Sequence, residues 1–259
     1  MPPRQFRTQA IILSRRDFGE SDRLLTLLTP GRGKIRAIAK GARKPSAKLS
    51  GHVELFARSD CLIYKGRNLD ILTQAQLIEP YLGLREDLGR GAYANYVAEL
   101  LDRFTADEEE ESGELFTLLH QTLARIAEAE DPRLAARFFE LQLLDLVGFR
   151  PELSECVISR AALEPEAQYF SYEEGGVVSR AAAPQVPARL VEIDIVTLKL
   201  LRHLQRSAEA WERVSSLRVT AGEHGRAERI MLGYIAHLLE RQLESIDFIR
   251  RLRQFSPNA

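Results

Sequence analysis

The sequence predicts a multidomain α+β protein in which a small β-barrel precedes a helical domain. Between residues 6 and 79, short runs of β-forming residues, one of them alternating polar with apolar, are bounded by Gly and Pro, as is typical of strands. From Tyr93 onward, apolar residues recur every three or four positions, which is typical of amphipathic helices. Residues 149–186 follow neither period. The change of period near Pro80 therefore separates two structural classes.

Five runs in the first third are predicted to be strands. Pro30 and Gly31 supply a turn between the second and third runs, and residues 65–68 form a compact hairpin turn between the fourth and fifth. Five strands with one long connection are typical of a small Greek-key barrel such as an OB-fold, and a five-stranded SH3-like barrel is the competing assignment. The five runs are Phe6–Ser14, Leu24–Thr29, Lys34–Lys40, Leu55–Tyr64 and Leu69–Glu79.

The third predicted strand and the loop after it carry an uninterrupted positive charge. One face of the strand is predicted to bury Ile35, Ala37 and Ala39, but a shift by one residue would bury Ile38 instead. Residues 24–53 contain no acidic residue, which suits a polyanion backbone. The candidate phosphate-binding residues are Lys34, Arg36, Lys40, Arg43, Lys44 and Lys48, with Arg15, Arg16, Arg23 and Arg67 as a second rank.

The net charge of −1 conceals an asymmetry along the chain. Residues 1–79 contain 15 lysines and arginines against 7 acidic residues, whereas the remainder contains 21 against 30. A basic first third on an acidic remainder predicts that one part meets nucleic acid and that the other has a different partner.

Composition also predicts the compartment. Two cysteines cannot make a disulfide framework, no apolar run approaches the ~18 residues of a membrane span, and the first residues lack the apolar core of a secretory signal. We therefore expect a cytoplasmic protein, associated with the nucleoid if it binds DNA.

Helical periodicity predicts the second domain. Asp131 and Pro132 have the residue types of an N-cap and a first helical position, and Gly148 ends that helix. Further helical pattern runs through Pro187–His203 and Arg226–Phe248. The predicted domains are residues 1–80, residues 81–149 with 186–249, and an insert at residues 150–185.

The insert has the spacing of a structural zinc ribbon, with two pairs of ligand positions around a loop of ~20 residues. Three of the four positions hold Ser or Ala, and one thiolate cannot hold zinc in a four-coordinate site. We therefore expect no zinc and no other cofactor, with Tyr169, Phe170 and Val177 packing the hairpin instead. The four positions are Cys156, Ser159, Ser179 and Ala182.

Catalytic motifs are not found. Residues 29–34 lack the spacing of a phosphate-binding P-loop, the five histidines show no ligand or triad spacing, and no GxSxG or GxGxxG motif occurs. The sequence therefore predicts no catalytic residues and no enzyme.

A set of short motifs extends through most of the chain, from about residue 8 to residue 245. They are Ala10–Leu13, Asp17–Asp22, Leu24 with Leu27 and Thr29, Gly33–Lys34, Ala39–Arg43, Gly148–Leu153, Cys156, Phe170–Ser171 and Glu174–Gly176. Together they resemble the bacterial RecO family of DNA repair and recombination mediator proteins.

The resemblance implies an N-terminal OB-fold, a helical C-terminal domain and a zinc-ribbon-like insert. It also implies a non-enzymatic protein that binds single- and double-stranded DNA and anneals complementary strands. With RecR, such a protein helps to load RecA onto DNA coated with single-strand-binding protein, whose acidic tail it contacts through the helical domain.

The residues and the resemblance predict electrostatic DNA binding with weak sequence preference. Little base stacking is expected, because only Phe18, Phe56 and Tyr64 lie near the basic residues. One alternative is a protein-interaction adaptor whose basic barrel patch docks an acidic peptide, and another is a small hydrolase with an unrecognised site.

Overall fold

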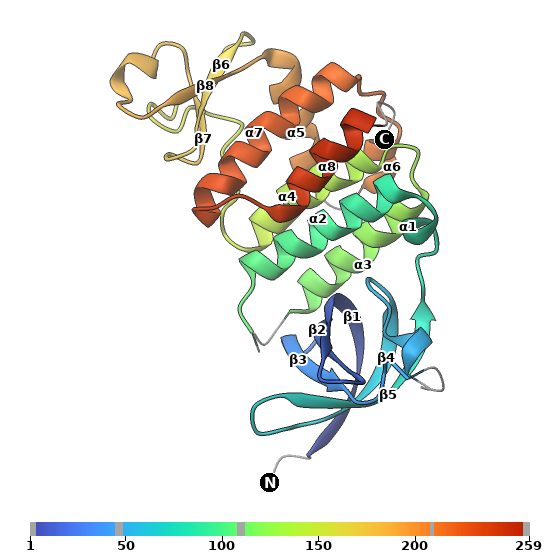
Figure 1. Cartoon of the computed structure of the whole chain (residues 1–259). Helices are drawn as coiled ribbons and strands as arrows, with labels where there is room; N and C mark the ends of the chain where they lie inside the picture. The colour runs from blue at the N-terminus through green and yellow to red at the C-terminus, as the bar shows by residue number, and fades with distance from the viewer. Residues whose placement is uncertain (1–3, 45–48, 108–111, 208–209, 256–259) are drawn as a thin grey trace. The chain divides into compact units, whose positions relative to one another are not determined.

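Five strands form a closed barrel in the first part of the computed structural model (Figure 1). The structure describes residues 4–44, 49–107, 112–207 and 210–255. Neighbouring strands pair antiparallel except β3 with β5, which are parallel, and β4 closes the ring against β1. The strands are β1 (Gln5–Phe18), β2 (Asp22–Thr29), β3 (Gly33–Ala39), β4 (Arg58–Tyr64) and β5 (Asp70–Glu79). The predicted five-stranded module is confirmed.

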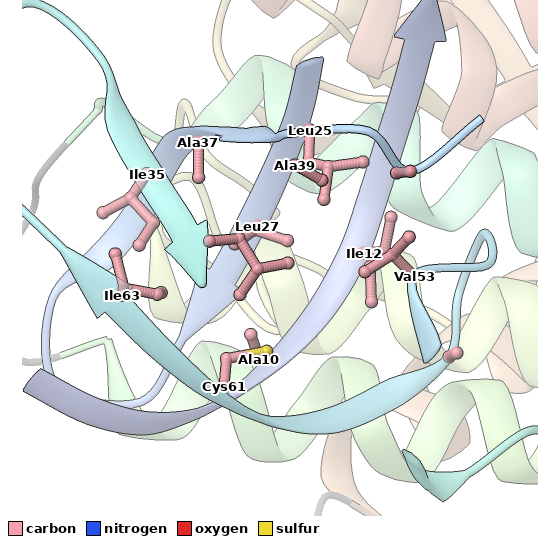
Figure 2. Close-up of a cluster of buried hydrophobic side chains, with 13 residues drawn as sticks. Ala10, Ile12, Leu25, Leu27, Ile35, Ala37, Ala39, Val53, Cys61 and Ile63 are labelled. Carbon is pink, nitrogen blue, oxygen red and sulfur yellow. The ribbon is translucent and has the colours of Figure 1, made fainter. Parts of the chain in front are cut away.

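Alternation along the strands fills the barrel with apolar side chains (Figure 2). Ile35, Ala37 and Ala39 of β3 are buried there, so the alternative register that buried Ile38 is wrong. Their main partners inside the barrel are Ala10, Ile12, Leu25, Leu27, Cys61, Ile63 and Leu72.

Strand β1 is longer than predicted. It continues past Ser14 to Phe18, because an irregularity between Ile12 and Ser14 lets the strand keep pairing with β2 as far as Asp22. The charged residues after Ser14 do not interrupt the strand, because backbone hydrogen bonds rather than burial hold its end.

The barrel and the following helices form one compact unit, residues 1–128 with 248–259. Tyr93 and Tyr96 are buried, so these aromatic residues belong to the core. A short 3-10 turn, Ser50–His52, precedes β4. The helices of this unit are α1 (Gly83–Glu86), α2 (Leu88–Phe104), α3 (Gly113–Glu128) and the second half of α8 (Glu244–Phe255).

Residues 129–247 form the second compact unit, which is mainly helical. Its helices are α4 (Pro132–Leu146), α5 (Ile195–Arg206), α6 (Trp211–Ser215) and α7 (Ala221–Leu239), and its strands are β6 (Gln168–Ser171), β7 (Gly176–Val178) and β8 (Leu190–Ile193), with a 3-10 turn at Ala183–Gln185. Among the described residues, no helix is long and apolar enough to cross a membrane.

Two predicted helices differ from the structure. The start of the stretch Pro187–His203 is β8, which pairs with β6, and Asp194 then caps α5. The stretch Arg226–Phe248 divides into two helices, because Glu240 takes a left-handed conformation with φ 54° and ends α7.

The insert strands pack against α7 through aromatic residues. Phe170 is fully buried, and its ring meets that of Tyr234 edge to face at 5.6 Å. Tyr172 lies over Gly233, where an added Cβ would stand 2.1 Å from the tyrosine oxygen. A glycine in the middle of this helix therefore makes room for a side chain of the insert.

We expect Gly233→Ala to destabilise the protein. The new methyl group would displace the Tyr172 ring and lower the free energy of unfolding by about 1–2 kcal/mol in urea melts. Gly225→Ala in the same helix is the matched control, since nothing lies within 4 Å of its Cβ position, and it should stabilise by up to about 1 kcal/mol. Equal effects at both positions would contradict the packing argument.

Asp131 connects α4 to α7. Its carboxylate accepts the Leu134 N–H at 3.0 Å, as an N-cap, and lies 2.8 Å from Nε2 of the buried His224. Burial alone would raise the pKa of Asp131, but the hydrogen bond and charge of His224, with the Leu134 N–H, lower it below the ordinary 3.8.

Stability should therefore fall in acid. A carboxylate with a depressed pKa stabilises the fold above about pH 4, and this contribution is lost as the pH falls through that depressed value. Asp131→Asn keeps the capping oxygen without the charge, so its free energy of unfolding should vary less than that of the natural protein between about pH 5 and 2. Parallel pH profiles for the two proteins would refute this assignment.

Candidate nucleic-acid interface

The outer surface of β1, β2 and β3 is a continuous three-stranded face. Leu25 and Leu27 point into the barrel, so the residues between them point outward. The strand register places the outward residues in three rows across the strands. These rows are Ser14–Thr26–Arg36, Arg16–Leu24–Ile38 and Phe18–Asp22. We call this surface the β1–β3 face.

Three predicted cations belong to this face or to its border. Arg16 and Arg36 are exposed on it, and Lys40 is exposed directly after the last residue of β3. The guanidinium of Arg36 lies 3.2 Å from the carboxylate of Asp107, in the connection between α2 and α3. Arg36 therefore already has an acidic partner within the chain.

The basic loop after β3 is anchored at its start. Gly41, with φ 65°, donates its N–H to the carboxylate of Asp22 at 2.7 Å, and the N–H of Arg43 bonds the Ser21 carbonyl at 2.9 Å. Lys44 is exposed beside this anchor. The structure thus brings Lys40 and Lys44 to one border of the β1–β3 face. Lys48 lies outside the described residues.

Arg43 also acts as a clamp. Its guanidinium donates to the carbonyls of Gly19 and Glu20 at 3.4 and 3.3 Å and lies 3.2 Å from the Asp17 carboxylate. It therefore holds the β1–β2 turn against the basic loop, and only part of its charge faces solvent.

Arg15 and Arg23 share one acidic partner. Glu54 lies 2.6 Å from the guanidinium of Arg15 and 3.5 Å from that of Arg23. Both arginines are half-buried at one end of the barrel, and the pairing lowers their availability to phosphate. Arg67 is exposed on the β4–β5 turn, and the strand register does not place it on the β1–β3 face.

Lys34 is buried, although it belongs to the same strand as Arg36. Its ammonium donates to the carbonyls of Asp102 and Thr105 at 2.7 and 2.9 Å and pairs with the Asp102 carboxylate at 2.9 Å. These groups end α2, so Lys34 caps this helix where its dipole is negative. This lysine joins the barrel to the helix, and we leave it out of the interface.

Comparison with known proteins identifies the family. The sequence profile of the recombination protein O N-terminal domain matches residues 1–81, and that of the C-terminal domain matches residues 85–247. This chain belongs to the RecO family. A DNA repair protein RecO of Roseiflexus sp. (strain RS-1) is 38% identical over 98% of this chain and 88% of its own length. One of Dehalococcoides mccartyi (strain BAV1) is 33% identical over 97% of both chains, and one of Pelotomaculum thermopropionicum is 36% identical over 96% of this chain and 95% of its own.

Of the four predicted ligand positions in the insert, only one holds a cysteine. The Cys156 sulfur accepts N–H groups of Ser159 and Ser179 at 3.5 and 3.3 Å. Burial would raise the pKa of this thiol, but these hydrogen bonds outweigh burial and lower it to about 6. Among the described residues, no three His, Cys, Asp or Glu side chains form a group that could hold a metal ion. Absence of zinc remains a prediction, to be checked by elemental analysis of the purified protein.

Sequence reasoning did not find the acidic partners of the cations. Asp107 lies about 70 residues from Lys34 and Arg36 in the sequence, and it meets both in space, at 3.6 and 3.2 Å. Glu54 meets the arginines of β1 and β2 in the same way. The sequence showed only that residues 24–53 contain no acidic residue. It could not show which carboxylates outside this stretch approach the cations in the fold.

Lys34 and Lys40 should differ sharply when substituted. Lys34→Met removes a buried ammonium from two carbonyls and a carboxylate, which should lower the free energy of unfolding by about 1–3 kcal/mol. Lys40→Met, the matched change on an exposed position, should alter it by less than about 0.5 kcal/mol. Urea unfolding of both variants measures the difference, and a stable Lys34→Met protein would overturn the capping role.

Proposed function

We propose that this RecO-family chain is a DNA-binding protein of recombinational repair that catalyses no reaction. It binds single- and double-stranded DNA and anneals complementary strands. With RecR it helps to load RecA onto DNA coated with single-strand-binding protein. The names of the relatives, which are DNA repair proteins, and the name of the family support a repair role.

The observation that carries this proposal is the set of free cations at the β1–β3 face. Arg16, Lys40 and Lys44 are exposed and, within the part of the chain that the structure describes, form no ion pair. Neutralising phosphates with such groups releases counterions, which supplies affinity without sequence preference. Shielding the charge of two complementary strands lets their bases pair, so annealing needs no external energy source.

Each predicted domain has a separate role in this proposal. The barrel is of the OB-fold class, a five-stranded Greek-key barrel that commonly binds nucleic acid. Residues 1–80 bind DNA, and residues 150–185 form a ribbon-like insert. The helices of residues 81–149 and 186–249, which are divided between the two compact units, contact the acidic tail of single-strand-binding protein. The protein acts in the cytoplasm, at the nucleoid.

A second candidate is an adaptor whose basic patch docks an acidic peptide. The pairing of Arg36 with Asp107 favours it, because a carboxylate of this chain already occupies part of the β1–β3 face. Competition between an oligonucleotide and an acidic peptide for the same protein discriminates the two functions. Displacement of the peptide by excess oligonucleotide is expected for a DNA-binding face.

Affinity for DNA should fall steeply with salt. Each phosphate contact contributes about −0.9 to the slope of log K against log salt for duplex DNA, so Lys40→Ala and Lys44→Ala should each reduce the slope by about 1. Both variants should weaken binding to all sequences alike, as measured by fluorescence anisotropy at several salt concentrations.

Arg85→Ala serves as the control, because this exposed arginine lies on α1 rather than on the β1–β3 face. It should leave the slope unchanged. A flat salt response of the natural protein, or an equal effect of Arg85→Ala and Lys40→Ala, would count against the proposed function.

A further inference from the structure

Phe18 is an exposed aromatic side chain at the end of β1. It is 44% exposed and stands opposite Asp22 in the outermost row of the β1–β3 face. Single exposed apolar residues are ordinary on protein surfaces, so exposure alone assigns no role. The surroundings of this ring are what distinguish it.

The strand end that carries Phe18 is held in place. Gly19 takes φ 57° and opens the turn, and the carbonyls of Gly19 and Glu20 accept the Arg43 guanidinium. The N–H of Arg43 bonds the Ser21 carbonyl at 2.9 Å. The aromatic ring is therefore presented from a strand whose turn is tied to the basic loop, so little conformational entropy is lost when a ligand covers the ring.

Charge around the ring favours a polyanion. Arg16 lies on the same face, two residues before Phe18, and Lys40 follows β3, which is separated from β1 by β2. Of the three carboxylates closest in the sequence, Asp22 accepts the Gly41 N–H at 2.7 Å and Asp17 pairs with Arg43, while Glu20 is exposed in the turn. An aromatic side chain on the same face as the unpaired cations Arg16 and Lys40 matches a strand that carries phosphates and flat bases together.

We infer that Phe18 stacks on an unpaired nucleobase while Arg16 and Lys40 hold the flanking phosphates, so that the β1–β3 face prefers single strands to duplex. The inference rests on the proposed function and names the substrate class of the same face. Bases within a duplex are covered by their neighbours, so the ring gains nothing from them. This assignment replaces the expectation of little base stacking.

The test compares three probes: an oligothymidylate, an abasic strand of the same length and a duplex. Phe18→Ala should weaken binding of the oligothymidylate about tenfold, and leave binding of the abasic strand and the duplex unchanged. Phe18→Leu keeps the apolar volume without the aromatic face, and should show the same loss. Phe18→Trp should restore binding. Leu88→Ala, which removes an exposed apolar side chain from the start of α2, should change nothing.

Several results would overturn the inference. Unchanged oligothymidylate binding by Phe18→Ala and Phe18→Leu would exclude stacking, and equal losses on all three probes would indicate a backbone effect. The acidic peptide of the competition experiment is measured alongside the three probes. A loss confined to binding of this peptide would assign the ring to a protein partner. The proposed function fails separately, if the natural protein binds no probe or binds with a flat salt response.

Discussion

Side chains of a strand point alternately to its two sides, and in β3 this alternation decides which residues reach solvent. Ile35, Ala37 and Ala39 fill the barrel, so Arg36 and Ile38 must point outward. The ring of strands is closed, so the inward set cannot exchange with the outward set without emptying the core. The charged face is therefore a consequence of core packing, and its position is as secure as the core itself.

The same alternation does not make the outward residues equivalent. Lys34 and Lys40 lie at opposite ends of β3, yet the first meets the end of α2 while the second meets solvent. A long aliphatic stem lets a lysine cross apolar surface and deliver its charge to helix carbonyls. Tertiary surroundings, rather than residue type, thus decide whether a cation stabilises the fold or remains available to a ligand.

Local pattern predicted the five strands and the start of α4 well. The Asp131–Pro132 pair placed the beginning of α4 correctly, because a cap and a fixed φ act within a single turn. The pattern failed where distant residues decided the outcome. Residues 190–193 have helical periodicity but pair with β6, and Glu240 breaks a stretch that looked continuous. Asp194, the N-cap of α5, was a local sign that the helix begins after β8, but the pairing of β8 with β6 and the left-handed break depend on what packs nearby.

Two features of the interface were likewise non-local. The acid-free stretch was visible in the sequence. The carboxylates that pair with Arg15, Arg23 and Arg36 belong to Glu54 and Asp107, which come later in the chain. Charge counted along the chain therefore overstated the charge available to a ligand. The exposed and unpaired cations of the β1–β3 face and its border, Arg16, Lys40 and Lys44, are a smaller set than the predicted one.

The ion pair between Arg36 and Asp107 has a consequence for kinetics. A phosphate that reaches this guanidinium replaces a carboxylate, so the gain is only the difference between two contacts of similar kind. When the phosphate leaves, the Asp107 carboxylate can pair with Arg36 again, so the guanidinium is never left without a partner. Such replacement lowers the barrier to departure of a bound phosphate, as the proposed transfer of strands would require.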